Sequence, residues 1–221
     1  MNVKDLLEQQ LLKEQQDKST RERSGKYSPS SLGRCYRNQY WNRKNEPQSN
    51  PISVDTLKIF ALGNMVHHLV QSLYPKERCE VKVETDDICG YADVVLDDAV
   101  IDIKSCRSYE FKLFAKPDYN IKGKLPNVLQ VCAYALYLNK PKGQLVFIEK
   151  DALQIKTFDL LLTDWSEQLV EELNTLRRFW MLDKLPLGIP RAYGGKECNY
   201  CGWKDKCFTL DGDKLKLKEV K

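Results

Sequence analysis

The clearest pattern of hydrophobic and polar positions runs from 90 to 106, and it predicts a β-hairpin. Two short apolar runs, 94–96 and 99–101, flank the acidic pair Asp97-Asp98. Aspartate is favoured in tight turns because it tolerates left-handed backbone angles. A two-residue turn at this pair sets the register, with Val94 facing Ile101 on the opposite strand.

The same register places two carboxylates opposite each other. Counting outward from the turn pairs Asp93 with Asp102, at roughly 5 Å between their Cβ atoms. Like charges held at that distance repel and invite a bound cation, and hard oxygen ligands suit Mg²⁺ or Mn²⁺. Lys104 shares the strand face of Asp102, whereas Ile103 points to the other face. The alternative is an exposed hairpin whose polar residues are merely solvated.

Periodicity along the rest of the chain predicts a mixed sheet flanked by helices, which is an α/β-type layer arrangement. Helices are expected over 3–17, 28–41, 55–73, 126–138 and 163–182, and strands over 80–85, 144–149 and 153–158. Residues 107–125 read as a longer connection and 183–196 as a Pro/Gly-rich connector. The expected helix caps are Ser28, Asp55 and either Thr163 or Asp164.

The N-terminal helix over 3–17 is amphipathic and short. Val3, Leu7 and Leu11 recur at i, i+4 and i+8 in a background rich in Gln, Glu and Lys. We expect it to dock on the surface of the domain, with binding to a partner protein as the alternative. The basic linker over 18–26 is expected to be solvated.

The helix over 55–73 offers a histidine to the candidate hairpin site. Its expected buried stripe consists of Leu62, Val66, Leu69, Val70 and Leu73. His67 lies about 100° round the helix from Val66, at the edge of the stripe, and His68 lies towards solvent. His67 can therefore reach a site beside the core, although a histidine in such a position is often purely structural.

The connection over 107–125 mixes basic and aromatic residues. These are Arg107, Lys112, Lys116, Lys122 and Lys124, interleaved with Tyr109, Phe111, Phe114 and Tyr119. The mixture suits a nucleic-acid strand, because cations meet phosphates and rings stack on bases. A solvated loop with its rings turned inward is the alternative. In the next helix, Gln130 and Tyr134 share one face, and polar groups on a mostly apolar helix need partners.

Composition limits the classes of protein that the chain can belong to. Of the 221 residues, 42% are hydrophobic and 30% charged, which is enough for a real core. The net charge of +4 permits a polyanionic partner without demanding one. No stretch approaches the roughly 18 apolar residues of a membrane span, and the N-terminus is too charged for a secretory signal. We therefore expect a cytoplasmic, intracellular protein.

Three of the eight cysteines are spaced like ligands. Cys198, Cys201 and Cys207 follow an x2 and x5 spacing, and Cys35 would be the natural fourth ligand. Zinc and an iron–sulfur cluster both accept four thiolates, and spacing alone does not decide between them. Either would tie the N-terminal part of the chain to its C-terminal part. The remaining cysteines are expected to be buried or incidental thiols: Cys79, Cys89, Cys106 and Cys132.

Taken together, the motifs resemble the RecB-like nucleases of the PD-(D/E)XK superfamily. The likeness is greatest to the iron–sulfur branch, which includes the CRISPR-associated Cas-four exonucleases and the AddB-type nuclease domains. The matching motifs are Ser30-Ser31-Leu32 with Cys35 and Tyr40, Gly63-x-x-x-His67, Gly90-x-x-Asp93, Asp102-Ile103-Lys104, Gln130-x-x-x-Tyr134 and Cys198-x-x-Cys201-x5-Cys207. The resemblance implies a restriction-endonuclease-like core with a mixed central sheet, joined to a four-cysteine cluster module.

The resemblance also implies roles for these residues. His67, Asp93, Asp102 and the Ile103 carbonyl would bind Mg²⁺ or Mn²⁺. Lys104 would position or activate the attacking water and stabilise the charge that develops on the phosphate. Gln130 and Tyr134 would orient the scissile strand. The four cysteines, Cys35, Cys198, Cys201 and Cys207, would hold a [4Fe–4S] cluster, with zinc as the alternative.

Three regions follow from this comparison. Residues 1–27 would form the N-terminal helix and basic linker, 28–183 the nuclease core, and 184–221 the cysteine-cluster module and tail. Within the core, 28–41 also supplies the first cluster cysteine. One departure is visible, because Tyr36 follows Cys35 where proline often follows in that branch. It should alter the helix turn without altering ligation.

Two functions remain in competition at this stage. The first is a metal-dependent exonuclease on single-stranded DNA, often acting from the 5′ end, in CRISPR adaptation, phage recombination or DNA end processing. The second is a non-catalytic adaptor that holds DNA for a partner integrase or helicase. The intact Lys104 favours the nuclease. Oligomeric state cannot be read from the sequence.

Overall fold

The computed structural model describes residues 2–19 and 24–211. The strands are β1 (Cys79–Glu84), β2 (Cys89–Val95), β3 (Ala99–Cys106), β4 (Lys142–Glu149) and β5 (Ile155–Leu161). The α-helices are α1 (Val3–Ser19), α2 (Tyr36–Arg43), α3 (Val54–Gln71), α4 (Ser108–Phe114), α5 (Leu125–Tyr137), α6 (Leu162–Met181) and α7 (Lys204–Asp211). Short 3₁₀ helices are η1 (Pro29–Ser31), η2 (Lys76–Arg78), η3 (Ile121–Lys124) and η4 (Tyr193–Tyr200).

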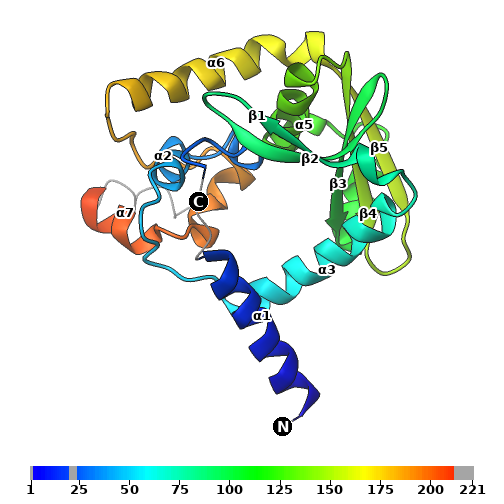
Figure 1. Ribbon diagram of the computed structural model, residues 1–221, viewed down its shortest axis with the longest axis horizontal. Helices are drawn as coiled ribbons and strands as arrows, with labels where there is room; N and C mark the ends of the chain where they lie inside the picture. Colours follow the sequence, from blue (N-terminus) through cyan, green and yellow to red (C-terminus); the bar gives the residue numbers. More distant parts are fainter. Residues whose placement is uncertain (1, 20–23, 212–221) are drawn as a thin grey trace.

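The five strands form one mixed sheet in the order β1-β2-β3-β4-β5. Strands β3 and β4 are parallel, joined by a crossover through α4 and α5, and the other neighbours are antiparallel. Helices α5 and α6 contribute to the large apolar cluster on one face, and α3 contributes to a smaller cluster on the other (Figure 1). The α/β fold class and the mixed sheet flanked by helices are confirmed.

The predicted hairpin register is confirmed next to the turn, but the predicted ladder pair of Asp93 and Asp102 is not formed. Val94 pairs with Ile101, Val95 pairs with Val100, and the Leu96 N–H donates to the Ala99 carbonyl at 2.8 Å across the turn. The alternation of side chains therefore follows the sequence pattern, with Ile103 fully buried against the α3 side of the sheet.

The expected helix over 28–41 is wrong as a single element. The structure has η1 followed by α2, and the break falls at Gly33, whose φ of +74° is left-handed. No side-chain cap comes from Ser28, and Cys35 is the residue that precedes the first turn of α2. A left-handed residue cannot continue a right-handed helix, so the chain turns before Cys35.

Two further caps were predicted wrongly. Ser53, and not Asp55, caps α3 by accepting from the Thr56 N–H. Leu161 precedes α6 without a side-chain cap, so neither Thr163 nor Asp164 performs that role. In both places the helix begins one or two residues earlier than the periodicity indicates, which moves the cap position upstream.

The buried stripe of α3 is narrower than predicted. Val66 is buried, but Leu62, Leu69 and Leu73 are 52%, 51% and 76% exposed. Helical spacing shows which side chains share a face, and it cannot show whether another element covers that face. Only the part of α3 near Val66 and Val70 meets the sheet.

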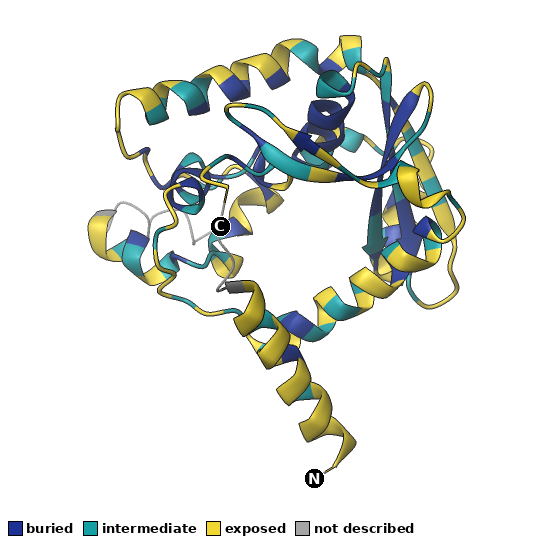
Figure 2. Cartoon of the chain, in the orientation of Figure 1, coloured by how far each residue is buried: buried dark blue, intermediate teal, exposed yellow. Residues whose placement is uncertain are grey.

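Helix α1 confirms the predicted N-terminal helix and projects from the body of the molecule (Figure 1). Leu11 is buried, and Glu8 accepts from Lys58 of α3 at 2.7 Å, so one side of α1 docks on α3. Figure 2 shows that most of its length is exposed. The linker over 18–26 and the tail after Phe208 lie partly outside the described residues, and the predicted three-region division stays a prediction.

The expected connection over 107–125 contains the helix α4, and two of its rings are core residues. Phe111 and Phe114 are buried in the larger cluster, whereas Tyr109 is exposed. Within the described ranges, none of the helices has both the length and the hydropathy of a membrane span.

The role of the left-handed Gly33 in breaking the chain before α2 can be tested by substitution. Gly33→Ala forces an L-residue to a φ of +74° and places a Cβ 3.3 Å from both Leu129 Cδ1 and the Pro126 backbone. Gly25→Ala is the matched control, because φ is +65° there and nothing lies within 4 Å. We expect the control to lower the free energy of unfolding by about 1 kcal/mol and Gly33→Ala to lower it by about 1 kcal/mol more. Urea denaturation of both variants measures the difference, and equal losses would contradict the packing argument.

Candidate active site

The candidate site lies where strand β2 separates from β3. Only two residue pairs join these strands in the ladder, and the pairing ends before Asp93 and Asp102. On its other side, β2 pairs with β1 at Cys79 and Val81 but not at the intervening Glu80, whose φ is +49°. Asp93 is therefore at a fork in the sheet, with no ladder partner on either side. The backbone groups that the fork releases need other partners.

The side chain of Asp93 accepts a backbone hydrogen bond from β3 that the β2–β3 ladder does not form. Its Oδ2 accepts a hydrogen bond from the Ile103 N–H at 2.7 Å, and His67 Nδ1 lies 3.6 Å from the same oxygen. Burial raises the pKa of Asp93 to about 6, while the Lys104 charge and the Ile103 N–H oppose this rise. Burial, with the nearby Lys104 charge, lowers the pKa of His67. A neutral imidazole is the form that ligates a cation.

Asp102 is the more deeply buried of the two carboxylates, at 1% exposed. Its Oδ1 accepts from Lys104 Nζ at 2.8 Å. Its Oδ2 lies 2.7 Å from the same nitrogen but in a direction that leaves it without a hydrogen bond. Burial raises the pKa of Asp102 to about 6, and the Asp93 charge adds to the rise while Lys104 opposes it. The Lys104 ammonium is thus the cation that pairs with Asp102 among the described residues.

These donors fit a divalent cation, although their positions are not those of ligands around one. Among the described residues, no group of three or more His, Cys, Asp or Glu side chains converges tightly enough to hold a metal ion. At this site the Ile103 N–H donates to Asp93 and the Lys104 ammonium donates to Asp102. The buried Oδ2 of Asp102, which lacks a hydrogen bond, remains the oxygen best suited to a cation.

Helix α5 brings Tyr134 to the fork. Tyr134 is 3% exposed, and burial raises the pKa of its hydroxyl, with the charges of Asp102 and Asp93 adding to the shift. Its hydroxyl lies against Gly90 of β2, where a Cβ would come within 2.5 Å. Gln130 is buried one turn earlier on the same helix, but no hydrogen bond within the described chain joins it to the two carboxylates. Tyr134 thus lies against β2 at the fork, and the predicted role of Gln130 stays a prediction.

Two residues at the fork were missed by the sequence analysis. Gln71 Nε2 donates to the Asp93 carbonyl at 3.2 Å and to Glu80 Oε1 at 2.6 Å. It follows His67 by four residues, so its place on the same face of α3 could have been read from the sequence. The position of Glu80 could not, because it depends on a left-handed backbone angle inside a strand.

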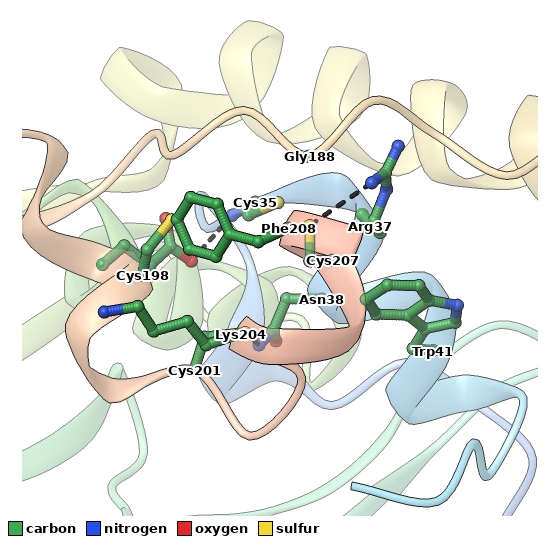
Figure 3. Close-up of a pocket in the computed structure, with 11 residues that line it drawn as sticks. Cys35, Arg37, Asn38, Trp41, Gly188, Cys198, Cys201, Lys204, Cys207 and Phe208 are labelled. Carbon is green, nitrogen blue, oxygen red and sulfur yellow. Dashed lines mark hydrogen bonds between the residues drawn. The ribbon is translucent and has the colours of Figure 1, made fainter. Parts of the chain in front are cut away.

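The four predicted ligand cysteines line one pocket between α2 and the C-terminal segment (Figure 3). None of the eight cysteines forms a disulfide. Arg37 donates to Cys207 Sγ at 3.3 Å, and Asn38 donates to Cys201 Sγ at 3.4 Å. Burial raises the pKa of Cys35 to about 12. Donors aimed at sulfur suit thiolate ligands, since they offset the negative charge on the sulfur atoms.

Four thiols that line one pocket are the ligand set of either a zinc ion or an iron–sulfur cluster. Zinc–sulfur bonds of about 2.3 Å would require sulfur atoms about 3.8 Å apart. The cysteines do not converge to the spacing of ligands around one ion. Away from the pocket, Cys106 and Cys132 are buried and Cys79 and Cys89 half-buried.

The contact between Gly90 and Tyr134 can be tested by a double-mutant cycle. We expect Gly90→Ala to lower the free energy of unfolding by about 1–3 kcal/mol, because the new methyl overlaps the Tyr134 hydroxyl. Adding Tyr134→Phe should recover about 0.5–1 kcal/mol of this loss, relative to the sum of the single variants. The part of the loss that is not recovered comes from Pro29 Cδ, which lies 2.9 Å from the position of the new methyl group. Urea denaturation of the four proteins measures the coupling, and strict additivity would show that the hydroxyl is not the obstacle.

Comparison with known proteins shows which solved structures have a similar fold. No protein-family model and no curated protein matches the sequence. The crystal structure of SSO0001 aligns over 97% of this chain and 98% of its own, with a TM-score of 0.55 and 20% identity. Two structures of an alkaline exonuclease, LHK-Exo from Laribacter hongkongensis, one of them in complex with dAMP, each align over 72% of this chain and 89% of theirs. Their TM-scores are 0.47 and 0.48, at 12% identity. The similarity to SSO0001 extends over nearly the whole of both chains and is a similarity of fold.

Proposed function

We propose that this chain is a divalent-metal-dependent exonuclease that hydrolyses single-stranded DNA from the 5′ end. The observation that carries the proposal is the pair of buried carboxylates at the β2–β3 fork, with Lys104 beside them and His67 at their edge. Burying two carboxylates together is costly unless a cation compensates them. A site that keeps both is suited to recruiting a cation and a polyanionic substrate.

The position of each residue at the site sets its proposed role. Asp93, Asp102, His67 and the Ile103 carbonyl would hold Mg²⁺ or Mn²⁺. When bound, such a cation shields the phosphate charge and makes water a stronger nucleophile at neutral pH. Lys104 presents an ammonium beside the carboxylates, where it would orient the attacking water and stabilise the charge that develops on the phosphate. Tyr134, and Gln130 one turn before it, would orient the scissile strand.

The surrounding chain supplies further support for a nucleic-acid substrate. The protein carries a net charge of +4, and the 107–125 segment carries both the exposed Tyr109 and several lysines, including Lys112, Lys116 and Lys122. Such a segment suits a single strand. The pocket of Cys35, Cys198, Cys201 and Cys207 would hold a [4Fe–4S] cluster that ties the two ends of the fold together. CRISPR adaptation, phage recombination and DNA end processing are the settings that fit this activity.

Lys104→Ala tests the proposal most directly. We expect the variant to cleave end-labelled single-stranded DNA at least about 100-fold more slowly than the wild type in Mn²⁺. Lys142→Ala is the matched control, because Lys142 pairs with Asp98 at the hairpin turn, away from the fork. It should retain wild-type activity, and chelator should abolish cleavage by both active proteins. The proteins are purified anaerobically, and substrates labelled at either end report which end is shortened first.

Equal cleavage by Lys104→Ala and the wild type would overturn the assignment of the site. Absence of cleavage by a folded, cluster-loaded wild type would favour the second candidate, a DNA-binding adaptor for an integrase or helicase. The observation that favours this candidate is the exposed apolar side chains of α1, among them Val3, Leu6 and Leu7. Deletion of residues 1–20 should then abolish assembly with the partner while leaving DNA binding intact.

A further inference from the structure

Glu197 is a buried carboxylate that connects the two halves of the cysteine pocket. It directly precedes Cys198, lines the pocket and is 6% exposed. Its Oε1 accepts a hydrogen bond from the Cys35 N–H at 2.8 Å. Its Oε2 accepts from the N–H groups of Arg191 and Ala192, at 3.0 and 3.2 Å. One side chain therefore fixes the backbone of the first cysteine against the segment that carries the other three.

The partners of Glu197 differ from those of the second buried carboxylate nearby. Glu172 of α6 is 3% exposed and forms an ion pair with Arg191, whose Nη2 lies 2.7 Å from Oε2. It also accepts from the Gly33 N–H and the Tyr36 hydroxyl. By contrast, no salt bridge within residues 2–19 and 24–211 includes Glu197. Its hydrogen bonds come from backbone N–H donors alone, while the Arg191 charge also interacts with it electrostatically.

We propose that Glu197 is the positioning residue of the cysteine pocket. It holds Cys35 in register with Cys198, Cys201 and Cys207 before the cofactor enters. Its negative charge then lowers the reduction potential of the bound cluster, because added negative charge near a cluster disfavours the reduced state. This inference rests on the proposed cofactor and is independent of the nuclease chemistry at the fork.

The test compares Glu197→Gln with the wild type during anaerobic reconstitution of the full chain with ferrous iron and sulfide. Glutamine keeps the size of the side chain but loses its charge and one acceptor. We expect about tenfold weaker cluster assembly at limiting iron, measured as iron and labile sulfide per chain and as visible absorbance. The loaded fraction should have a higher reduction potential than the wild type. Glu197→Asp keeps the charge on a shorter side chain. In this variant we expect the reduction potential to come closer to the wild-type value than the cluster content does.

Glu172→Gln is the matched control, since Glu172 is equally buried, touches the same chain segments and contacts no cysteine. It should lower the melting temperature while leaving cluster loading and reduction potential unchanged. Wild-type loading and potential in a folded Glu197→Gln protein would overturn the proposal, as would equal losses in the two glutamine variants. If Glu197→Gln does not unfold cooperatively, the same measurements on Glu197→Asp decide.

The test of Glu197 does not depend on whether the chain is a nuclease. Reconstitution, metal content and potential are all measured without DNA, so an inactive Lys104 site would not alter them. If the purified chain carries zinc and no visible absorbance, the role of Glu197 in tuning a potential is refuted. A fall in zinc content in Glu197→Gln relative to Glu172→Gln would still support its role in positioning Cys35.

Discussion

The burial of two carboxylates, Asp93 and Asp102, at one break in the sheet is the constraint on which the centre of this fold depends. Both carboxylates are nearly inaccessible to water, and burial disfavours their charged forms. The fold compensates with three groups, namely the Ile103 N–H, the Lys104 ammonium and the edge of His67. In an ordinary antiparallel ladder, the Ile103 N–H would bond to a backbone carbonyl of β2 and could not reach the Asp93 carboxylate. Strand β2 must leave β3 just there, so that a side chain can take over a backbone hydrogen bond.

The fork also explains the roles of residues that do no chemistry. Gln71 satisfies the Asp93 carbonyl that the ladder no longer pairs, and Glu80 adopts a left-handed angle where β1 passes the same point. Gly90 allows the Tyr134 hydroxyl of α5 to approach the strand closely. Helices from both faces of the sheet thus meet at one break in its hydrogen bonding.

The sequence was sufficient to predict the hairpin, its register and the residues that it brings together, because turn chemistry and a period of two act locally. The motifs likewise located Cys35 and the C-terminal cysteines, which line one pocket. What it could not predict depends on contacts between distant elements. Leu62 and Leu69 are exposed on a helical face that no element of the described chain covers, and Glu172 and Glu197 are buried although charged residues are usually solvated. The break at Gly33 was overlooked although glycine is a local signal for it.

The hydrogen bond between Cys35 and Glu197 joins positions separated by 162 residues. Synthesis runs from the N-terminus, so Cys35 leaves the ribosome long before the segment that completes its pocket. Contacts of such long sequence separation form late and slow the folding of a chain. A cofactor held by Cys35 together with Cys198, Cys201 and Cys207 could therefore be inserted only after Cys207 has been made. Until then the Cys35 backbone also lacks Glu197, the carboxylate that accepts its hydrogen bond.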